Sequence, residues 1–301
     1  MPMRRRESLF LIAAAFAGLA AQRPPPVPRG GPALWRIERN RAQGYILGVG
    51  DVKDATWLTP RISSALDHTL ELWLETAQPD PTVRPTNLQQ RTSLQLEKSL
   101  GYEDDHDLFE ALGPELSARV LAAAERLGVA RADLRTARAW MAATLLERAY
   151  WAKRAEAGAG LDETPSAVLA GLARANRKPV HAAIASGDDL TRRLAGMAPD
   201  VQRERLAFLL DDFDDARAGD SDRYAWTTGH ASSAALERMR TRYPQLYQLE
   251  HIEGGLDWAH RIDGLVSRGG VYVFAVDVER TLGPDNLLDK LRDHGFLPEP
   301  V

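Results

Sequence analysis

The chain has 301 residues, of which 44% are hydrophobic and 27% charged. This composition is typical of a globular protein, and it excludes a disordered chain and a chain that lies wholly within a membrane. The formal net charge is -4 and the sequence pI is about 6.0. Because phosphate contacts require clustered Lys and Arg, we expect no nucleic-acid partner.

The amino terminus has the pattern of a secretory signal peptide. Residues 4–6 are three arginines, residues 9–17 are an apolar run, and residues 18–20 (GLA) place small residues in a cleavage pattern. The apolar run is too short for a transmembrane helix of about 20 residues. We therefore predict an exported, periplasmic protein of bacterial type, which makes no membrane contact once the leader is removed. The Sec and Tat routes, and cleavage or retention of the leader as an anchor, remain open.

The chain divides into three segments by composition. Residues 1–21 form the predicted signal peptide, and residues 22–32 are rich in Pro and Gly, which predicts an extended tether. Residues 33–301 are then expected to form a single domain. The chain has no cysteine, so a lipid-attachment cysteine and disulfides are both excluded and packing alone must hold the fold.

The predicted elements follow from apolar periodicity and from helix-start signals. The first part of the chain predicts a β-hairpin of residues 35–38 and 44–49, a helix from Thr59-Pro60 to about Leu66, and a strand of residues 70–75. The remainder predicts helices starting at Gly113-Pro114, at about Ala130 (to Ala155) and at Thr164-Pro165, a strand of residues 179–184, a helical series of residues 190–210, a strand of residues 271–276, and a last helix opened by Pro284 and ended at Gly295.

This order of elements predicts an α/β fold. Strands lie at both ends of the chain, and the middle is largely helical, with a helical insertion of about residues 105–175. We therefore expect a mixed central sheet that the carboxy-terminal strand completes. The two ends of the domain must then meet in space.

Several short blocks of sequence are arranged in an order that resembles one known family. The blocks are residues 34–50 (LWRIERNRAQGYILGVG), the strand ending in Glu75, the helices from Leu116 to Leu146, Lys178-Pro179-Val180, Ala225-Trp226 followed by Gly229, and Ala275-Val276 leading to Gly283-Pro284-Asp285. Together they resemble the TraB/GumN family over nearly the whole chain after the leader. The resemblance implies the α/β fold of that family, which is related to Tiki-type peptidases and is pictured as metal-dependent hydrolases.

The resemblance also implies where a metal site would lie. The family pattern has a Gly-x-x-His, a Glu on the next strand, an acidic residue after Lys-Pro-Val, an Arg-Asn pair and a second Gly-x-x-His. These features fall in turn on Gly48 to Asp51, on Glu75, on Ile184, on Gly254 and Gly255, and on Asp277 to Arg280. Among the functional side chains of this pattern only Glu75 is retained, so the resemblance in fold comes with a changed site.

The residues at these positions suit a metal poorly. A hydrolytic metal needs about three protein ligands and an open position, and here Asp51 and Glu75 remain as oxygen donors. A permanent guanidinium at residue 280 would repel a cation, and it can form paired hydrogen bonds with a carboxylate. Our hypothesis is that Arg280 fills the former metal site by pairing with Asp51 or Glu75. The alternative is that Asp51 and Arg280 are unrelated surface residues.

Two function classes follow. The first is a catalytically degenerate binding or regulatory protein with no cofactor, an unknown peptide or protein partner and an undetermined oligomeric state. The alternative is a divergent metal-dependent hydrolase of peptidase type, with Asp51 and Glu75 as catalytic residues and Asp277 or Glu279 as further ligands of a divalent metal (Mn, Co or Zn). A purely structural or oligomeric role is the third class, and an exposed apolar patch on the helical insertion would favour it.

Overall fold

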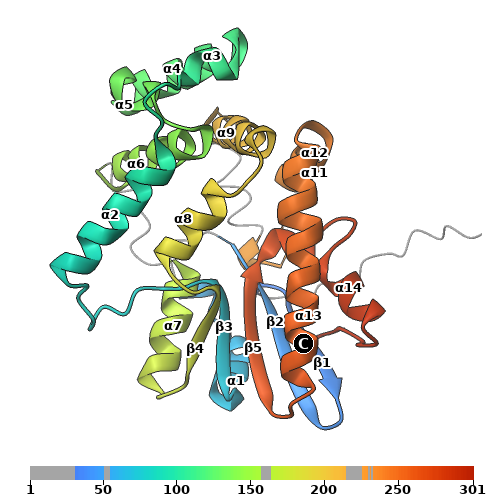
Figure 1. Ribbon diagram of the computed structural model, residues 1–301. Helices are drawn as coiled ribbons and strands as arrows, with labels where there is room; N and C mark the ends of the chain where they lie inside the picture. The colour runs from blue at the N-terminus through green and yellow to red at the C-terminus, as the bar shows by residue number, and fades with distance from the viewer. Residues whose placement is uncertain (1–30, 51–54, 157–163, 215–225, 230, 232) are drawn as a thin grey trace, which may run out of the picture.

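The computed structural model describes residues 31–50, 55–156, 164–214, 226–229, 231 and 233–301. The predicted signal peptide and Asp51 lie outside these residues. The fold is built on a six-stranded sheet with the strand order β4-β3-β5-β2-β1-β6 (Figure 1). The strands are β1 (Leu34–Arg39), β2 (Ala42–Val49), β3 (Glu71–Thr76), β4 (Val180–Ile184), β5 (Val271–Asp277) and β6 (Glu299–Pro300).

The sheet combines parallel and antiparallel pairs. Strands β2, β5, β3 and β4 run parallel to one another, and β1 pairs antiparallel with both β2 and β6. The predicted hairpin is confirmed, and its turn consists of Asn40 and Arg41, which both have positive φ as two-residue hairpin turns require. The expected mixed α/β sheet with strands from both chain ends is therefore confirmed.

Helices cover both faces of the sheet. The helices α1 (Pro60–His68) and α7 (Pro165–Ala175) share a buried apolar cluster with Leu72, Leu74 and Val273 on one face. The helices α13 (Gly254–Val266) and α14 (Leu287–Asp293) share a second cluster with Phe274 and Val276 on the other face. Strand β5 is buried on both faces, which explains its continuous apolar sequence VYVFAVD.

A third apolar cluster lies in a helical layer at one end of the sheet, towards the top of Figure 1. Its helices are α2 (Asn87–Gly101), α3 (Leu108–Leu112), α4 (Pro114–Leu127), α5 (Arg131–Arg135), α6 (Ala139–Glu156), α8 (Gly187–Ala195), α9 (Pro199–Asp214), α11 (Ala234–Arg242) and α12 (Pro244–Tyr247). Short helical segments complete the described chain: η1 (Ala55–Trp57), η2 (Gln248–Glu253), a π-helix, and η3 (Val278–Thr281). In the described residues no helix is long and apolar enough to cross a membrane.

The ends of the folded chain meet at the sheet edge, as expected. Strand β6 pairs with β1 through Trp35 and Arg36, and the backbone N–H of Val301 donates to the carbonyl of Leu34 at 2.9 Å. The last residues of the chain therefore complete the sheet beside its first strand.

Two helix predictions were wrong in their bounds. The helix expected from Ala130 to Ala155 is broken between α5 and α6, because Ala137 instead forms a β-bridge with Tyr102. The last helix begins at Leu287 and not at Pro284. Asp285 has a φ of 56°, which is incompatible with a helix, and Asn286 caps the helix by accepting from the N–H of Asp289.

The close contact of β1, β2 and β5 generates a stability prediction. A Cβ on Gly44 would lie 2.9 Å from Ile37 Cγ1 and 3.1 Å from Phe274 Cε2. We expect Gly44→Ala to lower the free energy of unfolding by about 1 to 3 kcal/mol through overpacking. Gly264→Ala is the control: that site is exposed on α13 with nothing within 4 Å, so alanine should stabilise by about 0.5 to 1 kcal/mol. Urea unfolding measures both changes, and equal effects would contradict the packing argument.

Candidate functional site

A pocket of about 380 Å³ lies where β3 and β4 end. Its walls come from the ends of these strands, from α8, α9 and α13, and from η2 and η3. The carboxyl edge of parallel strands is where open α/β sheets form ligand crevices, because loops and helix ends converge there. The pocket is therefore the candidate functional site.

Four of the positions that the family resemblance implies line this pocket together. Glu75 extends from β3, Ile184 ends β4, Gly254 opens α13, and Arg280 lies in η3. They are separated by up to 205 residues in the chain, and the parallel register of β3 with β4 and β5 brings them to one edge.

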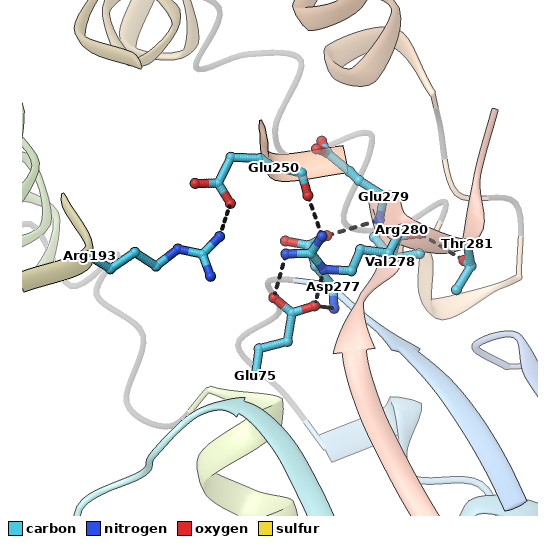
Figure 2. A network of polar contacts seen from close by, with 8 residues as sticks. All are labelled: Glu75, Arg193, Glu250, Asp277, Val278, Glu279, Arg280 and Thr281. Carbon is cyan, nitrogen blue, oxygen red and sulfur yellow. Dashed lines mark hydrogen bonds and ion pairs between the residues drawn. The ribbon is translucent and has the colours of Figure 1, made fainter. Parts of the chain in front are cut away.

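The centre of the site is an ion pair between Arg280 and Glu75, drawn in Figure 2. The guanidinium faces the carboxylate side-on: Arg280 Nε donates to Glu75 Oε1, and Nη2 donates to Oε2 at 3.2 Å. The backbone N–H of Asp277 also donates to Glu75 Oε1 at 3.0 Å. Both carboxylate oxygens of Glu75 are thus engaged, and the predicted pairing of Arg280 with Glu75 is confirmed.

A third contact ties the guanidinium to the helical side of the pocket. Arg280 Nη1 donates to the backbone carbonyl of Glu250, which lies in the π-helix η2 (Figure 2). A Cβ on Gly254 would lie only 2.6 Å from Arg280 Nη1, so residue 254 must be glycine for the guanidinium to take this position. Arg280 and Gly254 are therefore sterically matched.

Burial makes this pair costlier to break than a surface salt bridge, because either charge would be left without a partner. The side chain of Arg280 is 12% exposed and that of Glu75 is 26% exposed. Burial by itself would lower the pKa of Arg280, but the charge of Glu75 and its hydrogen bond outweigh it, so the pKa of the guanidinium is raised. Arg280 is a fixed positive charge at every working pH.

Of the other predicted positions, Asp277 contacts the pair through its backbone N–H, and Gly48 and Gly255 lie beside it. Gly48 lies against η3, where a Cβ would meet Val278 and Thr281 at 3.2 Å, and its carbonyl accepts from Trp226 Nε1 at 2.8 Å. Gly255 faces Lys290 and not the pocket. Asp277 caps η3 by accepting from the N–H of Glu279 at 2.9 Å.

Glu279 has the most perturbed carboxyl group near the site. Burial, together with the negative charges of Asp277 and Asp212, raises the pKa of Glu279 to about 8, although Arg238 and Arg280 oppose this. Nearby negative charges and the loss of solvent both disfavour the ionised form of a carboxyl group. Acidic side chains are therefore concentrated beside η3, next to the Arg280–Glu75 pair.

The described residues do not fit a metal centre. No group of three or more His, Cys, Asp and Glu side chains in the described ranges is arranged to hold an ion. Glu75, the ligand that the family pattern implies, has both oxygens in hydrogen bonds, and a buried guanidinium lies against it. A divalent cation bound to Glu75 would be repelled by Arg280, so this donor set favours an internal ion pair.

Sequence reasoning did not identify the rest of the pocket. Arg193 on α8, Arg205 on α9, and Asp257, Trp258 and Arg261 on α13 all line it. The charged ones lie on the polar faces of amphipathic helices, and the sequence of such a face looks the same whether it faces solvent or a pocket. The available signal was weak: the spacing of 257 to 261 places two opposite charges on one helix face beside a tryptophan.

The ion pair generates a second prediction. Glu75→Gln removes the charge that balances the buried Arg280, and we expect a loss of about 2 to 3 kcal/mol in the free energy of unfolding. The matched control is Glu38→Gln, which breaks the Arg36–Glu38 pair whose side chains are 40% and 52% exposed, and which should cost less than about 0.5 kcal/mol. Chemical denaturation at neutral pH compares them. A small effect at Glu75 would refute the central role of the pair.

A third prediction concerns pH and His251. This side chain is 4% exposed, stacks on Tyr247 and lies with Nε2 3.0 Å from the carbonyl of Pro284. Burial lowers the pKa of His251, and the positive charges of Lys290 and Arg280 add to this, against the Pro284 carbonyl. The folded pKa therefore lies below the unfolded value near 6.5. Stability from this group is complete above pH about 6.5 and is lost as the pH falls through the folded pKa.

The measurement for His251 is the urea midpoint between pH 7.5 and pH 5. We expect His251→Gln, which keeps a hydrogen-bond donor, to lose less stability over this range than the wild type. His260→Gln replaces an exposed histidine on α13 and should follow the wild type. Parallel curves for the wild type and His251→Gln would contradict the assignment.

Comparison with known proteins places this geometry in a family. The sequence model of the TraB/PrgY/gumN family matches residues 33–300. No curated protein and no solved structure matches the chain closely enough to count as similar. The family match spans both ends of the sheet, the helical layer and every described residue of the pocket. The chain belongs to the TraB/PrgY/gumN family.

Proposed function

We propose that this chain is an exported binding or regulatory protein in which an internal ion pair takes the place of a catalytic metal. The observation that carries the proposal is the contact of Arg280 with both oxygens of Glu75. Since Glu75 is the one metal-ligating side chain of the family pattern that this chain keeps, its engagement by a guanidinium removes the donor on which a metal site would depend. Export is proposed from the leader pattern of residues 1–21 alone.

The pocket supports a binding role. It keeps a volume of about 380 Å³ at the strand ends after Arg280 and Glu75 have paired. Charged, aromatic and aliphatic side chains all line it, which is the composition of small-molecule and peptide sites. The proposed protein therefore uses the family crevice to recognise a ligand without chemistry on it.

The alternative is a divergent metal-dependent hydrolase of peptidase type. The acidic side chains of η3 favour it, because the backbone of Asp277 contacts Glu75 and the carboxyl group of Glu279 lies among other acidic groups. Asp51, the other predicted ligand, is outside the described residues. This alternative requires Arg280 to leave Glu75, so that the carboxylate could bind Mn, Co or Zn. The buried contacts of Arg280 oppose that movement.

Metal content tests the proposal. We expect mature wild-type protein, purified without chelator, to contain no stoichiometric transition metal when measured by mass spectrometry. Arg280→His removes the guanidinium and restores one ligand of the family pattern, so its metal content should be at or above that of the wild type. Arg268→His, at an exposed site outside the pocket, controls for histidine added elsewhere. One equivalent of Mn, Co or Zn in the wild type would overturn the proposal in favour of the hydrolase.

A further inference from the structure

The charged side chains of the pocket are mostly satisfied within the protein. Arg280 pairs with Glu75, and Arg193 Nη2 lies 3.2 Å from Glu250 Oε2 (Figure 2). Arg205 lies 3.5 Å from Glu147. These pairs neutralise the greater part of the charge that lines the pocket. The charged side chains that have no such partner indicate which ligand chemistry the pocket can recognise.

Two pocket side chains of opposite charge have no such partner in the described part of the chain. Asp257 is exposed and forms no ion pair or side-chain hydrogen bond with any described residue. Arg261 is half-buried and likewise has no carboxylate partner there; its guanidinium instead lies 5.4 Å from the ring centre of Trp73 and 5.9 Å from that of Trp258. The two indoles hold the cation in place by cation–π attraction and leave its hydrogen-bond donors unused.

The spacing of the two charges is set by the helix. Asp257 and Arg261 are four residues apart on α13, so they lie on one face about 6 Å apart along the axis. Side chains with this spacing commonly pair with each other, yet here they are not within ion-pair distance. An unpaired carboxylate and an unpaired guanidinium therefore border the same cavity, with a gap between them.

Another wall of the pocket carries aliphatic side chains. Ile184 comes from the end of β4, and Leu190 and Leu194 come from α8. A ligand that fits all three features carries an ammonium group for Asp257, a carboxylate for Arg261 and an apolar side chain for this wall. Phosphate-bearing ligands fit less well, because they offer no cationic group to Asp257, whose carboxylate would repel a dianion.

We propose that the pocket binds a zwitterion of the amino-acid class with an aliphatic side chain, held by Asp257 at its ammonium and by Arg261 at its carboxylate. The inference rests on the proposed binding function and names its ligand. Free amino acids and dipeptides share this chemistry, and the volume of about 380 Å³ admits either.

Isothermal titration of the full mature protein tests the inference with four probes: L-leucine, L-leucyl-L-leucine, N-acetyl-L-leucine and L-leucinamide. We expect leucine or leucyl-leucine to bind, and the one that binds more tightly identifies the source of the zwitterion. N-acetylleucine lacks the ammonium and leucinamide lacks the carboxylate, so each should bind at least about tenfold more weakly than leucine. Absence of binding by both leucine and leucyl-leucine would overturn the inference, as would equal binding of the blocked probes.

Variants locate the two contacts. Asp257→Asn and Arg261→Gln should each weaken binding at least about tenfold, and Arg261→Lys, which keeps the charge without the planar donor fork, should fall between Arg261→Gln and the wild type. Arg268→Gln, just beyond the end of α13, is the matched control and should bind as the wild type does. Unchanged affinity in both Asp257→Asn and Arg261→Gln would reject the site.

Metal content of the same samples separates this inference from the proposed function. A metal-free protein that binds no zwitterion would refute only the ligand assignment. A protein with stoichiometric metal would refute the metal-free binding function, whatever the titrations give. Circular dichroism melts confirm that each variant is folded, since Asp257 and Arg261 lie at the surface and in the pocket wall, not in the apolar core.

Discussion

The contact between Arg280 and Glu75 joins three elements of the fold at the carboxyl edge of the parallel strands. Glu75 belongs to the sheet, Arg280 to the turn after its central strand, and the Glu250 carbonyl to the helical segment that leads into α13. A buried charge without a partner is costly, so moving any one of these three elements away from the others would be unfavourable. The apolar cluster holds α13 on the sheet, and these hydrogen bonds tie the end of α13 that borders the pocket to Glu75.

The same contact involves two positions at which this chain differs from the family pattern that its sequence resembles. The family pattern implies an arginine at position 254 and a histidine at position 280, and this chain has glycine and arginine there. A Cβ at 254 would touch the guanidinium of Arg280 at 2.6 Å, so the loss of one side chain provides the space for the other. Arg280 therefore brings a positive charge into the crevice from the segment after β5, and this charge neutralises Glu75, the carboxylate that a metal would need.

Most of the fold could be predicted from the sequence, because its strands and helices have strong local signals. The hairpin turn at Asn40 and Arg41 and the apolar run of β5 are examples. The break at Ala137 could not be predicted, since it depends on a bridge to Tyr102 that apolar periodicity does not encode. At the site, the family pattern led to Glu75 and Arg280, because both follow directly from the ends of predicted strands. Asp257 and Arg261 were missed because their environment is created by other elements: Trp73 from β3 and the leucines of α8.

The place of β5 in the sheet has a consequence for how the chain can fold. This strand is formed by residues 271–277, yet it lies between β2 and β3, which are formed more than 190 residues earlier and do not pair with each other. Until residues 271–277 have been synthesised, both of those strands present open edges at the place of β5. Contacts of such long sequence separation are slow to form. The sheet therefore closes only after every described helix that precedes β5 has been synthesised, and until then the edges of β2 and β3 are open to pairing with other chains.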